Sequence, residues 1–452
     1  MLANRVLAGI VLTGVGFVTG TVPVSADPRP IGRAAQAFQV AQTGTTEGVD
    51  RTLEKALQES AKLKAEEARR DGTKAGVDAA VAAFLPTVSF TTDWALRGAV
   101  GYSAPQPGNT PTPSTIGVTV SQPIFDGFRR YNDLKRARAA ETAGTYALAD
   151  ARQQLLLDAA AAHLAVIRDT AIVALRSRSL AHYAEIAKST RARFDGGDAT
   201  KTDIDQSESR RELAVAELER ARGELAASRA EYAKLAGNAP RGTLVRAGVP
   251  DRALPRSEEE LVELARSSNP RIGAADSNAV AARFAAKAAV GEFLPAVDLQ
   301  VARERIYGYS ATVDRQDSFA VKLQVRVPIY SPSTMPKVRE ARALAMQRHY
   351  EAVDTRDGVV ASARTAFSRH RAAQARAAAL GRQTALARRA LEGVSKELLG
   401  GQRSVLDLLN AQEEVTNAEI GRVSAEYERD YTAYVILATI GRLDDRITVA
   451  GN

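Results

Sequence analysis

The chain contains one pattern twice, and this duplication restricts its fold more than any other feature of the sequence. The triplet FLP occurs at residues 84–86 and again at 293–295, and QPIF at 122–125 has the counterpart VPIY at 327–330. Single residues match in the same order: Gly197, Asp203 and Gly237 correspond to Gly401, Asp407 and Gly441. All these partners are 204 to 209 residues apart. Ordered matches at nearly one offset indicate an internal repeat, which divides the chain into residues 49–245 and 246–452.

A segment of alternating side chains follows the FLP triplet in each copy. In the first copy, residues 88–102 carry apolar side chains at most even positions, and residues 116–123 alternate in the same way after a loop rich in proline and threonine. The second copy repeats this arrangement at 297–301 and 319–327. Side chains alternate across a strand, so each segment would present one apolar and one polar face. The sequence therefore predicts four strands in two hairpins.

A half-buried hairpin of a soluble protein would show the same alternation. These hairpins are, however, the only strand-like segments that we find in the sequence, so their edges have no further partners. Exposed edges are unfavourable, and closure into a barrel removes them. Four strands are too few to close a barrel around water, so several chains must contribute, and a trimer would supply twelve strands.

Proline-free stretches of unusual length follow the hairpins. Residues 128–195 contain no proline and a single glycine, Gly144, and residues 337–399 also lack proline. Each is expected to be one helix, and ~65 residues at a rise of 1.5 Å would span roughly 100 Å. Shorter helical segments at 199–235 and 404–440 complete two helical hairpins, whose alanines allow close, coiled-coil-like packing. Long helices that bury only one stripe need neighbours, which again favours an oligomer.

The first 26 residues have the pattern of a secretory signal peptide. Arg5 precedes an apolar stretch from Val6 to Val24, and the small residues up to Ala26 provide a cleavage site. An N-terminal membrane anchor is the alternative, but the apolar stretch is short and the cleavage pattern follows it at once. Beyond Ala26, no run of eighteen apolar residues occurs that a spanning helix would need. We therefore expect export of the chain, in which residues 27–48 form a low-complexity segment without an assigned role.

Composition argues against several kinds of site. Cysteine is absent, which removes disulfides and thiolate metal ligands. The four histidines lie in helical sequence, where we expect ordinary helix-face residues and no metal site: His163, His182, His349 and His370. The net charge of +8 comes from basic residues that alternate with acidic ones along helices. This is typical of solvated helix faces, so we expect no nucleic-acid partner.

One stretch imitates a phosphate-binding loop without meeting its requirements. Residues 196–202 are GGDATKT, with Thr200 where a nucleotide-binding loop needs a glycine before its lysine. A long helix, rather than a strand, precedes it, which indicates a turn between helices. Neither a Gly-x-Ser-x-Gly elbow nor a His-Glu-x-x-His helix occurs in the sequence. We therefore expect no enzyme activity and no cofactor.

The repeated order of FLP, strand pair, PIF or PIY, long helix, glycine-containing turn and long helix resembles the TolC family of outer-membrane export ducts. The resemblance covers residues 49–443, and its most specific parts are RFDGG at 193–197 and GQRSVLDLLNAQ at 401–412. It implies a mainly α fold in which long antiparallel helices form a trimeric α-barrel tunnel through the periplasm. Four strands per chain would contribute to a shared 12-stranded transmembrane β-barrel in the cell outer membrane. The first copy departs from the family pattern, because it lacks the Asn-Pro pair found at Asn269-Pro270 in the second.

The same resemblance implies roles for residues near the helix ends farthest from the strands. Asp407 and Asn410 would form rings at the periplasmic entrance, although the family often has an acidic residue where Asn410 stands. Arg403 would reach Thr202 and Asp203 on the neighbouring hairpin and hold the entrance closed; we call these three residues the entrance lock. Helix capping is a second interpretation of Asp203 and Asp407, since carboxylates are favoured at helix N-termini.

The turns at Gly197 and Gly401 would dock a periplasmic membrane-fusion adaptor, which would connect the channel to an inner-membrane ABC transporter or RND pump. Residues 401–410 and 434–443 are most similar to family members that serve type I secretion, so we expect an exported protein as cargo. A multidrug efflux channel is the alternative within the family. A periplasmic coiled-coil adaptor is the alternative outside it, although such an adaptor should have no hairpins with an outward apolar face. Outer-membrane lipid is the remaining expected partner.

Overall fold

The computed structural model describes residues 46–94, 114–240, 242–246, 248–249, 253–308 and 315–444. The chain divides into two units, Met1–Thr43 and Gly44–Asn452, and only the second contains described residues. The expected signal peptide at 1–26 and nearly all of the segment 27–48 lie outside the described residues. The same holds for residues 95–102 of the first predicted strand.

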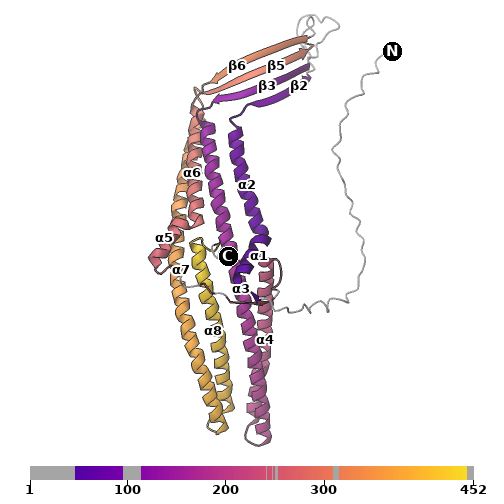
Figure 1. The fold of residues 1–452 in the computed structure, drawn as a ribbon, viewed down its shortest axis with the longest axis vertical. Coiled ribbons are helices and arrows are strands. Elements are labelled where there is room, and N and C mark those ends of the chain that lie inside the picture. The colour runs from indigo at the N-terminus through magenta and orange to yellow at the C-terminus, as the bar shows by residue number, and fades with distance from the viewer. Residues whose placement is uncertain are drawn as a thin grey trace, which may run out of the picture. The chain divides into compact units, whose positions relative to one another are not determined.

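Four long helices dominate the second unit (Figure 1). α3 (Arg129–Asp195) and α4 (Lys201–Ala236) form one antiparallel hairpin, and α7 (Thr334–Leu399) and α8 (Val405–Thr439) form the other. The predicted bounds differ from these by at most three residues. The largest difference is at the start of α7, because Pro336 is tolerated in the first turn of a helix. None of the described helices is both long and apolar enough to cross a bilayer.

Each repeat begins with a pair of shorter helices. α1 (Val49–Glu59) and α2 (Ala61–Ala82) open the first repeat. α5 (Glu258–Ser268), α6 (Pro270–Val290) and the 3-10 turn η2 (Gly291–Phe293) open the second. The predicted lead-ins are therefore helical, but each is broken once along its length.

A polar cap marks the break in both lead-ins. Asn269 accepts a hydrogen bond from the backbone N–H of Arg271 over 2.9 Å, and Pro270 begins α6. At the equivalent position 209 residues earlier, Ser60 accepts one from the backbone N–H of Leu63 over 3.2 Å. The Asn-Pro pair that the first repeat lacks is thus replaced by a serine cap, which is a comparable helix start.

The predicted hairpins join into a single antiparallel sheet of four strands. Its order is β2-β3-β5-β6, with the bounds Thr87–Trp94, Ser114–Phe125, Ala296–Tyr307 and Arg315–Arg326. The two repeats pair through β3 and β5, where Val120 lies opposite Val301. β2 and β6 are left at the edges. Figure 1 shows this sheet at one end of the long helices and the α3–α4 and α7–α8 turns at the other.

The pairing register gives the sheet one apolar and one polar face, as the alternation predicted. One row on the apolar face runs across all four strands through Val88, Val120, Val301 and Val321. A row on the opposite face runs through Thr91, Gly117, Glu304 and Ser318. In the single chain the apolar face is uncovered, with 66% of Phe90 and 71% of Phe319 exposed. An uncovered apolar surface of this kind marks a protein or membrane contact.

The expectation that the hairpins contain the only strands is wrong. β1 (Thr46–Glu47) and β4 (Thr243–Leu244) form a second, two-stranded parallel sheet. Two residues are too few to produce a readable alternation, so these two strands could not be predicted. This small sheet joins the end of segment 27–48, just before the first repeat, to the end of that repeat.

The main hydrophobic core lies where the shorter helices meet the long ones. Its completely buried members include Leu53 of α1, Leu156 of α3, Leu261 of α5 and Tyr434 of α8. Complete burial of one large aliphatic side chain contributes about 1.5–3 kcal/mol. Because helices of both repeats share this core, it joins the two helical hairpins in one body.

Candidate functional site at the helix tips

Both helical hairpins turn at the end far from the sheet, and both turns use the same backbone geometry (Figure 1). Gly197 and Gly401 have φ angles of 88° and 73°, a region that residues with a side chain avoid. The backbone N–H of Asp198 donates to the carbonyl of Arg193 over 2.8 Å, and the equivalent bond in the second turn measures 2.9 Å. No described atom lies within 4 Å of a Cβ built on either glycine. The backbone conformation, and not a lack of space, therefore requires glycine here.

Asp203 and Asp407 cap the helices that leave these turns. The carboxylate of Asp203 accepts from the backbone N–H and the hydroxyl of Thr200, both over 2.8 Å, and the Thr200 hydroxyl accepts from the Asp203 backbone N–H over 3.2 Å. Asp407 and Ser404 form the same reciprocal box, with distances of 3.0, 2.9 and 3.2 Å. The hydrogen bond from the backbone N–H of Thr200 lowers the pKa of Asp203, and the one from the backbone N–H of Ser404 lowers the pKa of Asp407. Both aspartates are therefore ionised helix caps, whatever further role they have at an entrance.

Arg403 lies in the second turn and is held by its own hairpin. Its Nε donates to Oε2 of Glu397 over 2.9 Å, and this hydrogen bond raises the pKa of Arg403. Within the described part of the single chain, no hydrogen bond or ion pair joins Arg403 to Thr202 or Asp203. The entrance lock would form against a neighbouring hairpin, so it stays a prediction. Glu397 is a competitor for Arg403 that sequence analysis did not identify.

Asn410, the second residue of the predicted ring, contacts the first helical hairpin. Nη2 of Arg210 on α4 donates to Oδ1 of Asn410 over 3.3 Å, and Nη1 donates to Oε2 of Glu413 over 2.5 Å. One guanidinium thus connects α4 to two positions one turn apart on α8. Sequence analysis missed Arg210 and Glu413. The spacing of three between Asn410 and Glu413, which places both on one helix face, was the available signal.

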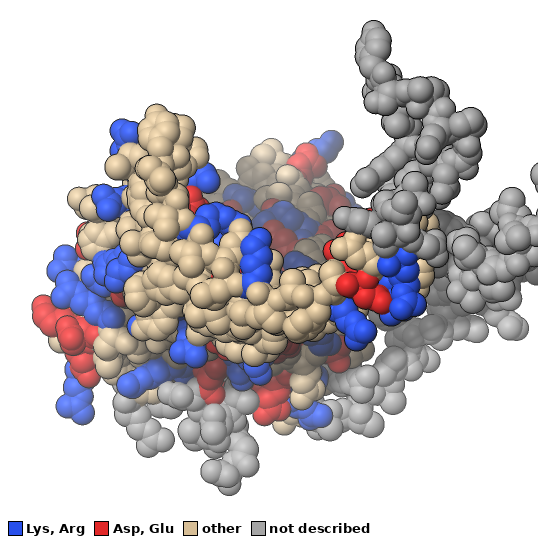
Figure 2. Space-filling model, turned by 90° about the horizontal axis from the view of Figure 1, so that it is seen from above, with Lys and Arg blue, Asp and Glu red and all other residues tan. Residues whose placement is uncertain are grey.

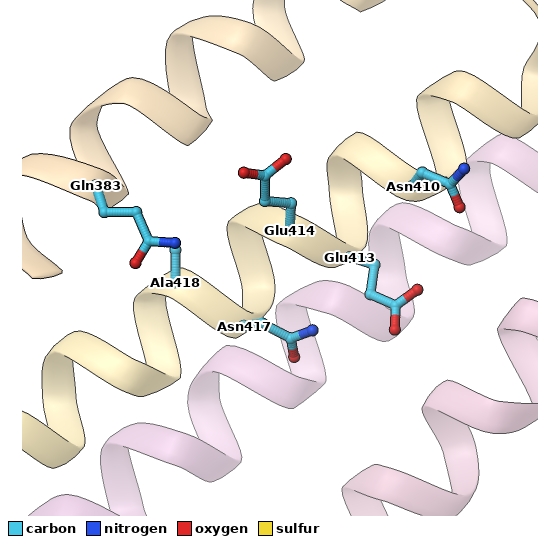
Figure 3. A pocket seen from close by; sticks show the side chains of 6 residues that line it. All are labelled: Gln383, Asn410, Glu413, Glu414, Asn417 and Ala418. Atoms are coloured by element: carbon cyan, nitrogen blue, oxygen red, sulfur yellow. The ribbon is translucent and has the colours of Figure 1, made fainter.

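A shallow recess of about 390 Å³ opens beside this bridge. Figure 3 shows Asn410, Glu413, Glu414 and Asn417 along α8, with Gln383 on the neighbouring α7. The polar side chains that line the recess are amides and carboxylates. Glu413 is paired with Arg210, so Glu414 supplies the remaining negative charge of this lining, which favours cations over anions.

The two tips differ in their packing. Leu409, on the second turn of α8, is completely buried and belongs to an apolar cluster with Tyr183 and Ala214 of the first helical hairpin. The equivalent residue 204 positions earlier, Asp205 on α4, is exposed. The start of α8 therefore rests against the first hairpin, whereas the start of α4 presents a polar side chain.

Two histidines do not lie on helix surfaces, which corrects the expectation for them. His163 is completely buried; its Nδ1 lies 2.8 Å from Oγ1 of Thr52 and its Nε2 lies 3.1 Å from the carbonyl of Val245. Burial lowers the pKa of His163. His370 is also buried, with Nδ1 3.0 Å from Oγ1 of Thr432. Alanine-rich helices give little contrast between inner and outer faces, so the sequence did not reveal this. The described residues contain no cluster of His, Asp or Glu that would suit a metal ion.

Both tips lie within segments of the chain that match a known protein family. The family described as outer membrane efflux protein matches residues 52–238 and 261–442, one segment in each repeat. The outer membrane efflux protein BepC of Brucella suis biovar 1 (strain 1330) is 32% identical over 343 residues, which are 74% of this chain and 75% of BepC. This chain belongs to the outer membrane efflux protein family. The predicted resemblance to TolC-type channels is therefore confirmed.

A more distant relative and solved structures agree with this membership. The alkaline protease secretion protein AprF of Pseudomonas aeruginosa is 23% identical over 319 residues, 69% of this chain and 66% of AprF. The Campylobacter jejuni CmeC outer membrane channel superposes with a TM-score of 0.79 at 13% identity, covering 95% of this chain and 97% of CmeC. CusC superposes with a TM-score of 0.77 at 16% identity, covering 90% and 95%. At these identities the structures show a common fold.

Membership settles the location and the general class. This outer membrane efflux protein resides in the outer membrane with its helical part in the periplasm. Its family consists of channels, so it is not an enzyme. The predicted combination of long helices with a few strands is confirmed.

Proposed function

We propose that three copies of this chain form one export channel, in which a shared β-barrel crosses the outer membrane and the long helices enclose a periplasmic tunnel. The observation that carries this proposal is the four-stranded sheet with one apolar face and two unpaired edge strands. In a trimer, β6 of one chain would pair with β2 of the next and remove both edges. The apolar faces would then meet lipid, and the polar faces would line a water-filled interior.

The height of the sheet supports this arrangement. On β5, the side chains of one face run from Val297 to Tyr307, ten residues apart. At a rise of ~3.3 Å this is roughly 33 Å along the strand. A strand tilt of 35–45° reduces the vertical height of the strand to about 25 Å, which is enough to cross the apolar band of an outer-membrane barrel.

The proposed channel is the outer part of a three-component system, with a periplasmic adaptor at the tips and an inner-membrane ABC transporter beneath it. The tips suit docking because their turns at Gly197 and Gly401 are exposed and protrude at the end far from the sheet. For the cargo we propose a secreted protein. The similarity to AprF, whose name describes alkaline protease secretion, supports this choice. Small-molecule efflux is the second candidate, because the more similar BepC is named an efflux protein.

Oligomeric mass tests the channel. Light scattering of the detergent-extracted protein, corrected for bound detergent, is expected to give about three times the mass of one chain. Circular dichroism of the same sample would show whether the long helices are intact. A monomer that retains full helicity would contradict the proposal, because its sheet edges would be stable without partners.

Gene deletion tests the cargo. Deletion should abolish export of at least one protein that lacks an N-terminal signal, and the wild-type gene supplied in trans should restore it. Sensitivity to dyes and detergents is measured in the same strains. Increased sensitivity with unchanged protein export would select small-molecule efflux instead.

A further inference from the structure

A charged cluster interrupts the apolar face of the sheet at the end farthest from the helices. On β5 and β6, the rows of this face nearest the helices pair Val297 with Val325, Leu299 with Leu323 and Val301 with Val321. The next rows pair Arg303 with Phe319, Arg305 with Asp317 and Tyr307 with Arg315. Three arginines and one aspartate therefore interrupt the otherwise apolar and aromatic part of this face on β5 and β6; we call Arg303, Arg305, Arg315 and Asp317 the rim cluster.

One carboxylate orients two of the guanidinium groups. Nε of Arg305 lies 2.5 Å from Oδ1 of Asp317, and Nη2 of Arg315 lies 3.2 Å from Oδ2 of the same residue. Arg303 adds a third positive charge one row nearer the helices. Three positive charges stand against one negative charge, so the rim cluster has an excess of two positive charges. Figure 2, viewed from above, shows blue and red side chains together beside the grey residues and a mainly tan surface elsewhere over the sheet.

Aromatic residues indicate the depth of the rim cluster. Trp94, Ser114, Tyr307 and Arg315 form one row across the four strands. Tryptophan and tyrosine concentrate at the boundary between the apolar band and the headgroups in membrane barrels. Arg315 lies in this boundary row, Arg305 one row below it and Arg303 two rows below it. A charge that faces lipid costs less near the boundary than at the centre of a bilayer, and long arginine side chains can extend toward the headgroups. The helices are periplasmic, so this end of the sheet belongs to the outer leaflet.

We propose that Arg303, Arg305 and Arg315 bind the phosphate groups of the glycolipid of the outer leaflet, lipid A. Guanidinium groups bind phosphate through paired hydrogen bonds, and the excess positive charge of the cluster complements a phosphorylated headgroup. Arg303 and Arg305 are ~7 Å apart along β5, and Arg315 on the adjacent strand lies diagonally from Arg305, roughly 8 Å away. The three side chains can therefore converge on one headgroup. This inference rests on the proposed function, because it requires the apolar face to meet lipid.

A double substitution tests the site with a matched control. Arg303→Gln with Arg315→Gln removes two positive charges and leaves the pair of Arg305 with Asp317 in place. The control, Lys322→Gln with Arg326→Gln, removes the same charge from the opposite face of β6. Native mass spectrometry of the detergent-solubilised channel measures bound lipid A. We expect at least tenfold weaker binding for the first variant and a change below twofold for the control. Equal binding by the first variant and the wild type would overturn the proposal.

The source of the phosphate is tested with four probes: lipid A, dephosphorylated lipid A, phosphatidylglycerol and inorganic phosphate. Lipid A should bind at least tenfold more tightly than each of the other three. If dephosphorylated lipid A binds equally well, the arginines do not recognise phosphate. If phosphatidylglycerol binds equally well, any anionic lipid suffices, and if inorganic phosphate does, no lipid is needed. Each of these outcomes would overturn the assignment to lipid A.

The single tryptophan of the chain separates this inference from the proposed function. Trp94 is 79% exposed on the same face, and its fluorescence in vesicles should be quenched by phosphatidylcholine brominated in its acyl chains. Without quenching, the sheet does not enter the bilayer and the channel proposal fails. With quenching but unchanged lipid A binding by the double variant, only the lipid site fails. Arg303→Lys with Arg315→Lys keeps the charge but loses the paired geometry, so its binding should lie between that of the wild type and that of the glutamine variant.

Discussion

The two helical tips have the same backbone construction, but they pack differently against their surroundings. At each tip a glycine with positive φ closes one helix, and a hydroxyl and an aspartate cap the next. α8 then buries Val405 and Leu409, whereas Lys201 and Asp205, the equivalent residues of α4, are exposed. The duplication has thus kept the turn, which depends on local hydrogen bonds, while the faces beyond it have diverged to suit different neighbours.

This difference restricts how an entrance at the tips can open. The start of α8 is held to the first hairpin by apolar packing around Leu409 and by the bridge of Arg210 to Glu413. A movement of α8 away from α4 within one chain would have to expose Leu409 and break that bridge. Movement of both hairpins together would keep these contacts. It would change only the contacts between chains, including the predicted entrance lock.

The largest expected effect tests the packing difference directly. Leu409→Ala should lower the local opening free energy of the α8 tip by about 2–5 kcal/mol, because it leaves a cavity among completely buried side chains. Asp205→Ala, at the equivalent position of α4, should change its own tip by less than about 0.5 kcal/mol. Amide hydrogen exchange of peptides from each tip measures both. Similar effects at the two tips would show that the packing difference is absent in the assembled protein.

Glycine replacement tests what the tips share. Gly197→Ala and Gly401→Ala should each destabilise their tip by about 1–2 kcal/mol, because both positions have positive φ. The two effects should be nearly equal, since nothing described lies near either Cβ position. Gly223→Ala, within α4, is the control and should be neutral or stabilising. Hydrogen exchange in the two turns measures the result, and a clear inequality would mean that one turn has a neighbour in the assembly.

Removal of the caps should have a smaller effect that depends on pH. Thr200→Ala and Ser404→Ala should each cost about 1 kcal/mol at neutral pH. Folding lowers the pKa of Asp203 and of Asp407, so the caps contribute fully above the ordinary carboxyl pKa and lose that contribution as the pH falls through the lowered value. The difference between each variant and the wild type should therefore begin to shrink only when the pH falls below about 4, the ordinary carboxyl pKa, and shrink further as the pH falls through the lowered value. Hydrogen exchange, corrected for intrinsic rates, is measured at neutral pH and below the ordinary carboxyl pKa. If the difference in stability between variant and wild type is the same at both pH values, the ionised caps are not its source.

The entrance lock involves the smallest free energy, because solvent screens an exposed ion pair. Arg403→Ser with Asp203→Ala should raise single-channel conductance in planar bilayers, and Thr200→Ala controls for the lost cap. Glu397→Gln should have the opposite effect, because it frees Arg403 from the pair within its own hairpin. Asp407→Ala should mainly reduce cation selectivity. If the double variant conducts like the wild type, the entrance lock does not form, and Arg403 is only a solvated residue paired with Glu397.

The parts of the structure that follow from nearby residues could be predicted from the sequence. Proline-free, alanine-rich stretches fixed α3 and α7, because an unbroken helix needs only local hydrogen bonds. Alternation predicted the two faces of the sheet, because neighbouring side chains on a strand point to opposite faces wherever the strand pairs. Asp203 and Asp407 lie near the start of a predicted helix, where carboxylates are favoured, so capping was a recognisable interpretation. Their spacing of three residues from Thr200 and Ser404 is a second signal in the sequence for the capping box that the structure shows.

The tertiary structure alone decided which distant residues meet. It paired β3 with β5 and β1 with β4, buried His163, and placed Arg210 against Glu413. These contacts join residues far apart in the sequence, and they depend on which faces of the long helices are brought together in space. An exposed arginine on a helix has many carboxylates within reach in principle, and only the packing around Leu409 selects Glu413 as its partner.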